Sequence, residues 1–137
     1  MRVYIDGVFD LFHVGHLACL LAAYKVACES GEPELYVGVV SDEDAQSYKR
    51  LPIIPQADRA LIVGAIRGVS KVIVNCPLIV TPEFLEAWGI DLVVHGFAND
   101  ADREKQREFF AGIGDKFREI SYTHGVSTSE LIEKLRS

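Results

Sequence analysis

Residues 2–16 read RVYIDGVFDLFHVGH. This stretch opens with the apolar pattern of a buried strand, which the pair Asp6-Gly7 ends. His13 and His16 follow where an apolar helical pattern begins, and a spacing of three places both rings on one face of a helical turn. The stretch therefore predicts a strand, a turn and a helix start that carries two imidazoles.

Short apolar runs alternate with helical patterns along the rest of the chain. We predict strands over 2–6, 34–40, 71–74, 91–95 and 117–122, helices over 15–28, 57–66, 81–88, 100–111 and 128–136, and a loop over 42–56, which has two prolines and no clear period. The strand segments are largely continuous apolar runs, which is typical of strands covered on both faces. Five strand–helix pairs in series predict one α/β domain over 1–137, with a doubly wound, parallel five-stranded sheet.

Composition excludes several classes of protein. The 137 residues are 49% apolar, enough for a real core, and carry a net charge of -6, which argues against a nucleic-acid partner. No apolar run approaches the roughly 20 residues that span a bilayer, and no signal peptide is evident, so we expect no membrane partner. Three cysteines without metal-like spacing predict reduced, mostly buried thiols and a cytoplasmic location.

The histidine pair lies where a phosphate would bind. Ligands of open parallel sheets bind beyond the carboxyl ends of the strands, and Asp6-Gly7 marks that end of the first strand. Gly7 allows a tight turn, the amides after it and at the helix start form a positive pole, and imidazoles donate hydrogen bonds to phosphate oxygens. Two alternatives stay open: ordinary histidines near a helix start, or a metal pair, for which no third ligand has suitable spacing.

Five segments of the chain carry a family resemblance. The first, GVFDLFHVGH (7–16), resembles the His-x-Gly-His signature of the nucleotidyltransferase superfamily. The others are similar to further segments of the cytidylyltransferases that use phosphocholine, phosphoethanolamine or glycerol 3-phosphate: GVVSDEDAQSYKR (38–50), ADRALIVGAIRGVSKVIVNCPLIVTPEFL (57–85), IDLVVHG (90–96) and THGVSTSELI (123–132). The resemblance implies a Rossmann-like nucleotidyltransferase fold.

The resemblance also implies a reaction and its residues. CTP would give CMP to phosphoethanolamine or phosphocholine and release pyrophosphate, with Mg²⁺ carried by the nucleotide phosphates and with the chain as a homodimer. His13 and His16 would contact the triphosphate, and the catalytic Lys49 would bridge both substrates. Asp6 would join Lys49 in acceptor binding, because a carboxylate pairs with an amine head group. Further nucleotide contacts are implied for Gly7, Val8, Phe9, Arg67, Gly96, Gly125, Ser127 and Thr128.

Several of these residues have a purely structural alternative. Asp6 is also a typical turn residue, and Lys49 could be a solvated surface residue, as most lysines are. Ser127 with Glu130 fits a helix capping box without any ligand. For Arg59, in the segment of the predicted second helix, we expect a surface ion pair.

The chain departs from the family pattern at its closing motif. Tyr122 replaces an arginine and His124 an acid or amide, so His124 or Arg50 compensates, the nucleotide differs, or turnover is weak. Leu78 stands where the choline branch often has an aromatic residue, which favours ethanolamine or another amine. The alternatives are an adenylyltransferase that uses ATP, a glycerol-3-phosphate cytidylyltransferase, and a nucleotide-binding module with weak or no catalysis.

Overall fold

The computed structural model describes residues 1–121 and 128–136. Its centre is a parallel five-stranded sheet with the strand order β3-β2-β1-β4-β5. The strands are β1 (Arg2–Gly7), β2 (Glu34–Val39), β3 (Val69–Val74), β4 (Leu92–His95) and β5 (Phe117–Glu119). The predicted doubly wound α/β architecture is therefore confirmed.

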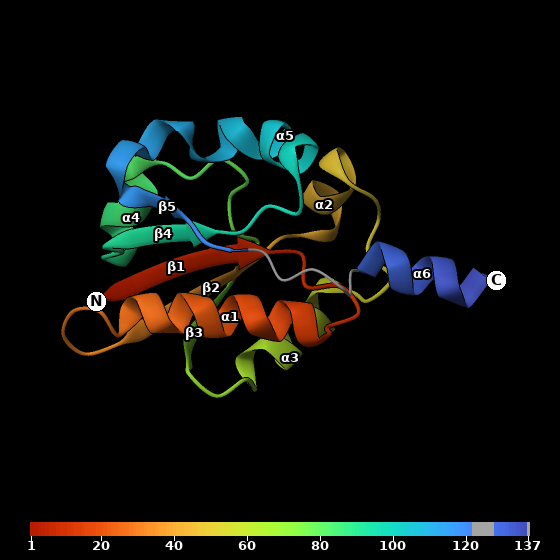
Figure 1. Cartoon of the computed structure of the whole chain (residues 1–137), viewed down its shortest axis with the longest axis horizontal. Helices are drawn as coiled ribbons and strands as arrows, with labels where there is room; N and C mark the ends of the chain where they lie inside the picture. The colour runs from red at the N-terminus through yellow and green to blue at the C-terminus, as the bar shows by residue number, and fades with distance from the viewer. Residues whose placement is uncertain (122–127, 137) are drawn as a thin grey trace.

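Helices cover both faces of the sheet (Figure 1). They are α1 (Val14–Ala27), α2 (Asp42–Tyr48), α3 (Gln56–Gly64), α4 (Pro82–Trp88), α5 (Asp100–Phe110), the 3₁₀ segment η1 (Ala111–Lys116) and α6 (Thr128–Arg136). The helices α1 and α3 lie on one face, and α4 and α5 lie on the other. None of the described helices is long and apolar enough to cross a bilayer.

The central strand β1 supplies both halves of the core. Its side chains alternate, so Val3 and Ile5 pack in the cluster that contains residues of α1. Tyr4 points the other way and packs with Leu85 of α4 and Phe110 of α5. This double burial explains why the strand reads as a continuous apolar run in the sequence.

The predicted loop over 42–56 is wrong in its first half, which forms α2. Ser41 caps this helix, because its hydroxyl accepts a hydrogen bond from the Asp44 amide at 3.1 Å. Three acidic residues in the first turn, 42–44, suit the positive helix N-terminus, and Ala45 is fully buried. The cap and the acidic turn were visible in the sequence, but the prolines at 52 and 55 obscured them.

The cysteines also depart from expectation. Cys76 is buried, but Cys19 is only partly buried and Cys28 is exposed. All three thiols are free, as predicted for reduced cysteines.

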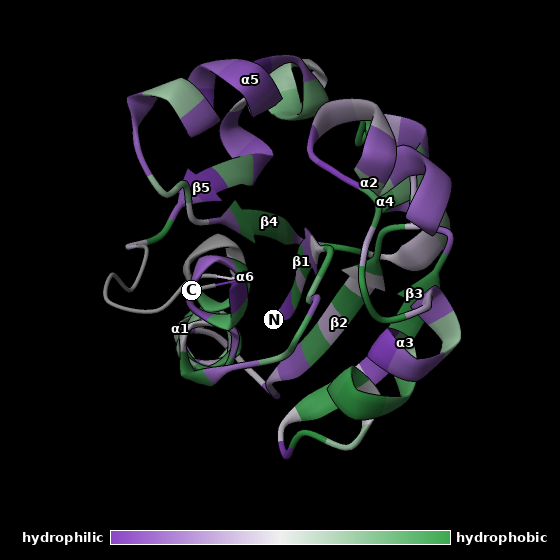
Figure 2. Ribbon diagram, turned by 90° about the vertical axis from the view of Figure 1, so that its right-hand side faces the viewer, coloured by the Kyte–Doolittle hydropathy of each residue, from purple (hydrophilic) through white to green (hydrophobic). Residues whose placement is uncertain are grey.

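The strand order places a crevice at the carboxyl ends of β1 and β4. From β1 the chain adds β2 and then β3 on one side of the sheet. It then crosses to the other side of β1 and adds β4 and β5, so the strand order reverses between β1 and β4. Viewed from this edge, α6 lies in front of the start of α1 (Figure 2). The fold thus gathers the loop after β1, the segment after α2, and the start of α6 around one crevice.

Candidate active site

A cleft of about 750 Å³ occupies this crevice, a volume in the range of small-molecule sites. Most of the site residues predicted from the sequence line it together: Asp6, Gly7, Val8, Phe9, His13, His16, Lys49, Gly96 and Thr128. Gly125 and Ser127 lie outside the described residues, as do Tyr122 and His124. The cleft therefore unites residues that are more than 110 positions apart in the chain.

The two histidines cap the N-terminus of α1 reciprocally. The Gly15 amide donates to His13 Nδ1 at 3.0 Å, and the His13 amide donates to His16 Nδ1 at 3.1 Å. Two backbone amides that we expected to face phosphate are therefore used inside the cap. Since each Nδ1 accepts a hydrogen bond, the ring proton of each neutral imidazole resides on Nε2. The rings, not these amides, present donors to the cleft.

The imidazole pair is tightly packed. The two rings stack with centroids 3.9 Å apart, and Phe9 and Phe12 lie against the His16 ring at 5.7 and 5.4 Å. His13 Nε2 is buried and has no hydrogen-bond partner among the described residues. A buried N–H without an acceptor is costly, so this atom marks where an anionic oxygen would be stabilised.

Burial keeps both rings neutral at pH 7. It lowers the pKa of His16 to about 3; the nearby His13 and Lys49 add to this effect, while Asp10 opposes it. Burial also lowers the pKa of His13. The pair therefore offers oriented N–H dipoles rather than fixed charges, and a bound anion would favour protonation of either ring.

Cationic side chains contribute another part of the cleft wall. Lys49 follows α2 directly, and Arg50 and Lys105 line the same cleft. Desolvation by the surrounding protein lowers the pKa of the Lys49 ammonium. The charge of Asp102 opposes this shift, and the positive charges of Arg50 and Lys105 add to it. An anion bound between these cations would relieve their mutual repulsion. Lys105 was not anticipated from the sequence.

Several polar side chains line the cleft together with Asp6. The Asp6 side chain is only 8% exposed, and its Oδ1 lies 3.3 Å from His95 Nδ1. Asp102 accepts hydrogen bonds from the Ala98 amide at 3.0 Å and from Gln106 Nε2 at 2.7 Å. Burial disfavours ionisation of Asp102, but these bonds outweigh it and lower the pKa of the carboxyl group.

Three of these polar residues, His95, Asp102 and Gln106, were missed, although His95 carried a usable signal. It ends the predicted strand 91–95, so the rule that ligands bind at strand ends could have identified it. Asp102 and Gln106 are one helical turn apart in α5, a spacing equally common on solvated helix surfaces. Only the packing of α5 over the sheet turns them toward the cleft.

The turn after β1 differs from the prediction. Left-handed backbone occurs at Phe9 and Leu11, with φ of 56° and 49°, and not at Gly7. A Cβ atom at Gly7 would lie 3.0 Å from the Phe9 ring, so glycine is needed there for close approach.

The structure separates the two arginines of the segment 57–67. Arg67 is exposed and precedes β3, at the sheet edge opposite the cleft, so it does not join the site within one chain. Its contact with the nucleotide remains a prediction. Arg59 was expected at the surface, and this expectation is wrong: its side chain is fully buried, although it does form an ion pair, with Asp42.

The fold and the cleft define a class of protein. A Rossmann-like sheet presents lysines and the imidazoles that cap α1 to one cleft, an arrangement suited to phosphate esters. A family model described as cytidylyltransferase-like matches residues 4–134. The chain belongs to the cytidylyltransferase-like family, and the resemblance seen in the sequence is confirmed.

Individual relatives agree with this family. The probable choline-phosphate cytidylyltransferase of Schizosaccharomyces pombe is 37% identical over 137 residues, which cover 98% of this chain and 37% of that protein. The ethanolamine-phosphate cytidylyltransferase of Dictyostelium discoideum is 36% identical over 137 residues, which cover 98% of this chain and 36% of that protein. The chain thus spans little more than a third of the length of these relatives.

A solved structure supports the fold. The lipopolysaccharide core biosynthesis protein from Thermoplasma volcanium GSS1 superposes with a TM-score of 0.69 at 24% identity, over 90% of this chain and 98% of that one. At this identity the likeness extends to the architecture alone.

Proposed function

We propose that the chain transfers CMP from CTP to a phosphorylated amino alcohol, phosphoethanolamine or phosphocholine, and releases pyrophosphate. The observation that carries the proposal is the reciprocal histidine cap, which holds two Nε2–H donors at a helix N-terminus in a cleft that lysines share. Membership of the cytidylyltransferase-like family and the names of the relatives support the reaction type.

The proposed chemistry is an in-line displacement. An oxygen of the acceptor phosphate forms a bond to the α-phosphorus, the bond to the bridging oxygen breaks, and that oxygen leaves with its electron pair on pyrophosphate. His13 and His16 donate hydrogen bonds to the triphosphate, where negative charge shifts during the displacement. Lys49 draws the two anionic substrates together, which reduces their repulsion and orients them.

The acceptor end favours a primary amine. Asp6 supplies a buried carboxylate for a cationic head group; it lies 3.3 Å from the polar His95 ring, and the Asp102 carboxylate lines the same cleft. A primary ammonium donates hydrogen bonds to carboxylates, whereas a trimethylammonium group prefers aromatic faces. We therefore expect phosphoethanolamine to be the better acceptor.

Mg²⁺ would accompany the nucleotide. No group of three or more potential metal-binding side chains occurs among residues 1–121 and 128–136. The protein residues described thus do not fit a dedicated metal cage, and the phosphates themselves would carry the ion.

A homodimer is proposed as well. Large apolar side chains remain exposed on α3 and next to it, with Leu61 at 75%, Ile53 at 52% and Val74 at 51% exposure. If these side chains form one continuous surface, it would be of the kind that a second copy of the chain covers. Sedimentation velocity of the wild type and of Leu61→Glu tests this proposal: a dimer that dissociates in the variant supports it, and a monomeric wild type contradicts it.

Pyrophosphate release tests the proposed reaction. The purified chain is assayed with CTP or ATP against phosphoethanolamine, phosphocholine and glycerol 3-phosphate, with Mg²⁺ present. We expect release that requires both CTP and an amino-alcohol phosphate. Turnover with ATP but not with CTP would overturn the choice of nucleotide. Turnover with glycerol 3-phosphate as the only acceptor would overturn the choice of acceptor. Tight nucleotide binding without turnover in any mixture would favour the binding module.

A further inference from the structure

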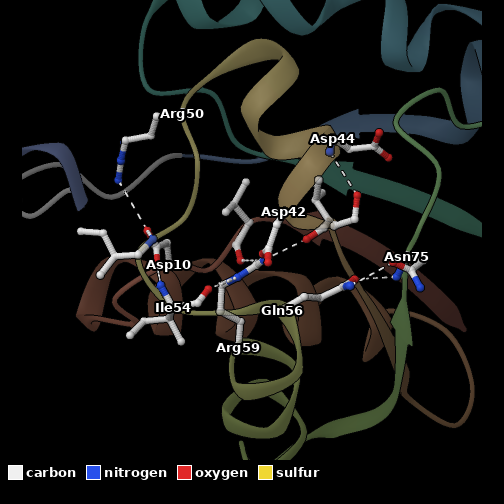
Figure 3. A network of polar contacts seen from close by, with 12 residues as sticks. Asp10, Asp42, Asp44, Arg50, Ile54, Gln56, Arg59 and Asn75 are labelled. Carbon is white, nitrogen blue, oxygen red and sulfur yellow. Dashed lines mark hydrogen bonds and ion pairs between the residues drawn. The ribbon is translucent and has the colours of Figure 1, made fainter.

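A buried polar network holds the segment that follows Lys49. We call residues 49–55, between α2 and α3, the lysine loop. Asp10 binds two consecutive amides of this loop: Ile53 donates to Oδ2 at 2.8 Å, and Ile54 donates to Oδ1 at 2.9 Å (Figure 3). Arg50 Nη2, at the start of the loop, lies 3.9 Å from Asp10 Oδ2. The Asp10 carboxylate is only 4% exposed, so its oxygens are largely shielded from water, whereas the Arg50 side chain is 38% exposed.

Arg59 also binds the lysine loop, through a carbonyl group. Its guanidinium donates to the carbonyls of Ile54 at 2.8 Å, Val8 at 2.6 Å and Val40 at 2.9 Å, and it pairs with the Asp42 carboxylate at 2.5 Å. Ile54 is therefore bonded through both its N–H and its C=O. Val8 belongs to the loop after β1, so the arginine ties the lysine loop to the segment that carries the histidines.

Asp10 also reaches the start of α6. Thr128 Oγ1 donates to the Asp10 carbonyl at 2.7 Å. One residue thus joins the loop after β1, the lysine loop and α6, the three segments that the fold gathers around the cleft. Asp10 precedes the first histidine by three positions, so it links the lysine loop to the segment that carries the histidine pair.

We propose that Asp10 and Arg59 are positioning residues that clamp the lysine loop to the loop after β1 and thereby set the distance between Lys49 and the histidine pair. The inference rests on the proposed transferase function for its kinetic consequences, but the clamp itself is a property of the fold. Displacing reacting groups by about 1 Å costs up to 10²-fold in rate, so holding the lysine loop in place has a direct catalytic value.

Asp10→Asn is the sharpest perturbation of this clamp. The substitution keeps the size of the side chain, but an amide offers one oxygen acceptor where the carboxylate offers two. One of the amides at Ile53 and Ile54 must then face an NH₂ group, and the charge that faces Arg50 is lost. Asp58→Asn is the matched control, because Asp58 is an exposed acid of α3 that adjoins Arg59 in the chain.

A double-mutant cycle with Lys49 separates positioning from general destabilisation. In the wild-type background we expect Asp10→Asn to lower kcat about 10- to 100-fold, with the KM for CTP changed less than about threefold. In a Lys49→Met background the same substitution should cost less than about threefold, because there is no lysine left to misplace. Asp58→Asn should change neither parameter. An equal loss in both backgrounds, or no loss in the wild type, would overturn the positioning role.

Amide hydrogen exchange tests the clamp independently of catalysis. Asp10→Asn should speed exchange at Ile53 and Ile54 relative to Asp58→Asn, and Arg59→Lys should loosen the same loop, because an ammonium cannot serve four acceptors in a fixed fork. Unchanged exchange in both variants would refute the clamp. If the wild type proves inactive with every substrate pair, the proposed reaction fails, but this exchange experiment still decides the clamp.

Discussion

Two substitutions of His16 separate its two roles. Asn places an oxygen near the position of Nδ1, so the variant His16→Asn retains an acceptor for the His13 amide but has no donor at the position of Nε2. Gln is itself a usual capping-box residue at this helix position, so His16→Gln can place its NH₂ group near Nε2 only when its oxygen turns away from the His13 amide. Both variants lose the ring contacts with Phe9 and Phe12, so this loss cancels when they are compared.

Loss of the donor should lower the rate, and loss of the cap should lower the stability. Removing one donor from a group that stabilises developing charge costs about 10²–10³ in kcat. Removing a helix cap costs about 1 kcal/mol, which lowers Tm by about 4 °C in a domain of this size. His16→Asn should therefore keep the cap and be the slower enzyme. In His16→Gln a retained rate should be accompanied by the loss of stability, because the oxygen and the NH₂ group of Gln cannot serve the cap and the ligand in one conformation.

Pyrophosphate release and thermal unfolding measure these two quantities on the same samples. His13→Asn provides a parallel test, because the Gly15 amide donates to its Nδ1 in the same way. A His16→Asn variant with a near-wild-type rate would show that the ring is a capping residue alone, and the proposed contact with the triphosphate would fall.

Three further predictions concern pH, packing and the acceptor. In the folded chain the pKa of His16 is about 3, below the ordinary 6.5, so between these pH values the unfolded chain binds one proton more. The free energy of unfolding, measured in urea, should therefore fall as pH drops from 6.5 to 3, and it should fall less in His16→Asn. Equal pH profiles of the two proteins would contradict the burial of His16. Gly38→Ala should lower the free energy of unfolding in urea by about 1–3 kcal/mol, because the added Cβ would lie 2.1 Å from Tyr4 Oη. Gly112→Ala is the control and should be neutral, because no atom lies within 4 Å of its added Cβ. A neutral Gly38→Ala would refute the packing. Asp6→Asn should raise the KM for phosphoethanolamine about tenfold while leaving that for CTP unchanged, and steady-state kinetics with an unchanged acceptor KM would exclude Asp6 from the acceptor site.

Much of the architecture was predictable because it depends on local pattern. Apolar runs and helical periods are read within a dozen residues, and they placed five parallel strands in the right order along the chain. The junction of Asp6-Gly7 with His13 and His16 was predictable for the same reason, since strand end and helix start adjoin. The helix α2 was missed where two local signals conflicted, a capped acidic turn and the prolines after it.

Arg59 and Asp10 show the limit of local reading. In sequence, Arg59 is one charged residue in an amphipathic helix. Its burial becomes acceptable only when four acceptors surround it, three of them from segments 17 to 51 positions away. Asp10 likewise finds its partners more than 40 positions away. Such satisfaction of buried polar groups depends on how the loops pack and leaves no periodic signal.

The sequence alone determined the sheet, its ligand-binding edge and the imidazole pair, because strand and helix preferences act between near neighbours. The tertiary structure decided which donors the imidazoles keep for a ligand, which acids and lysines share the cleft, and what holds the lysine loop. Those outcomes follow from hydrogen bonds and burial between segments that meet only when the chain is folded.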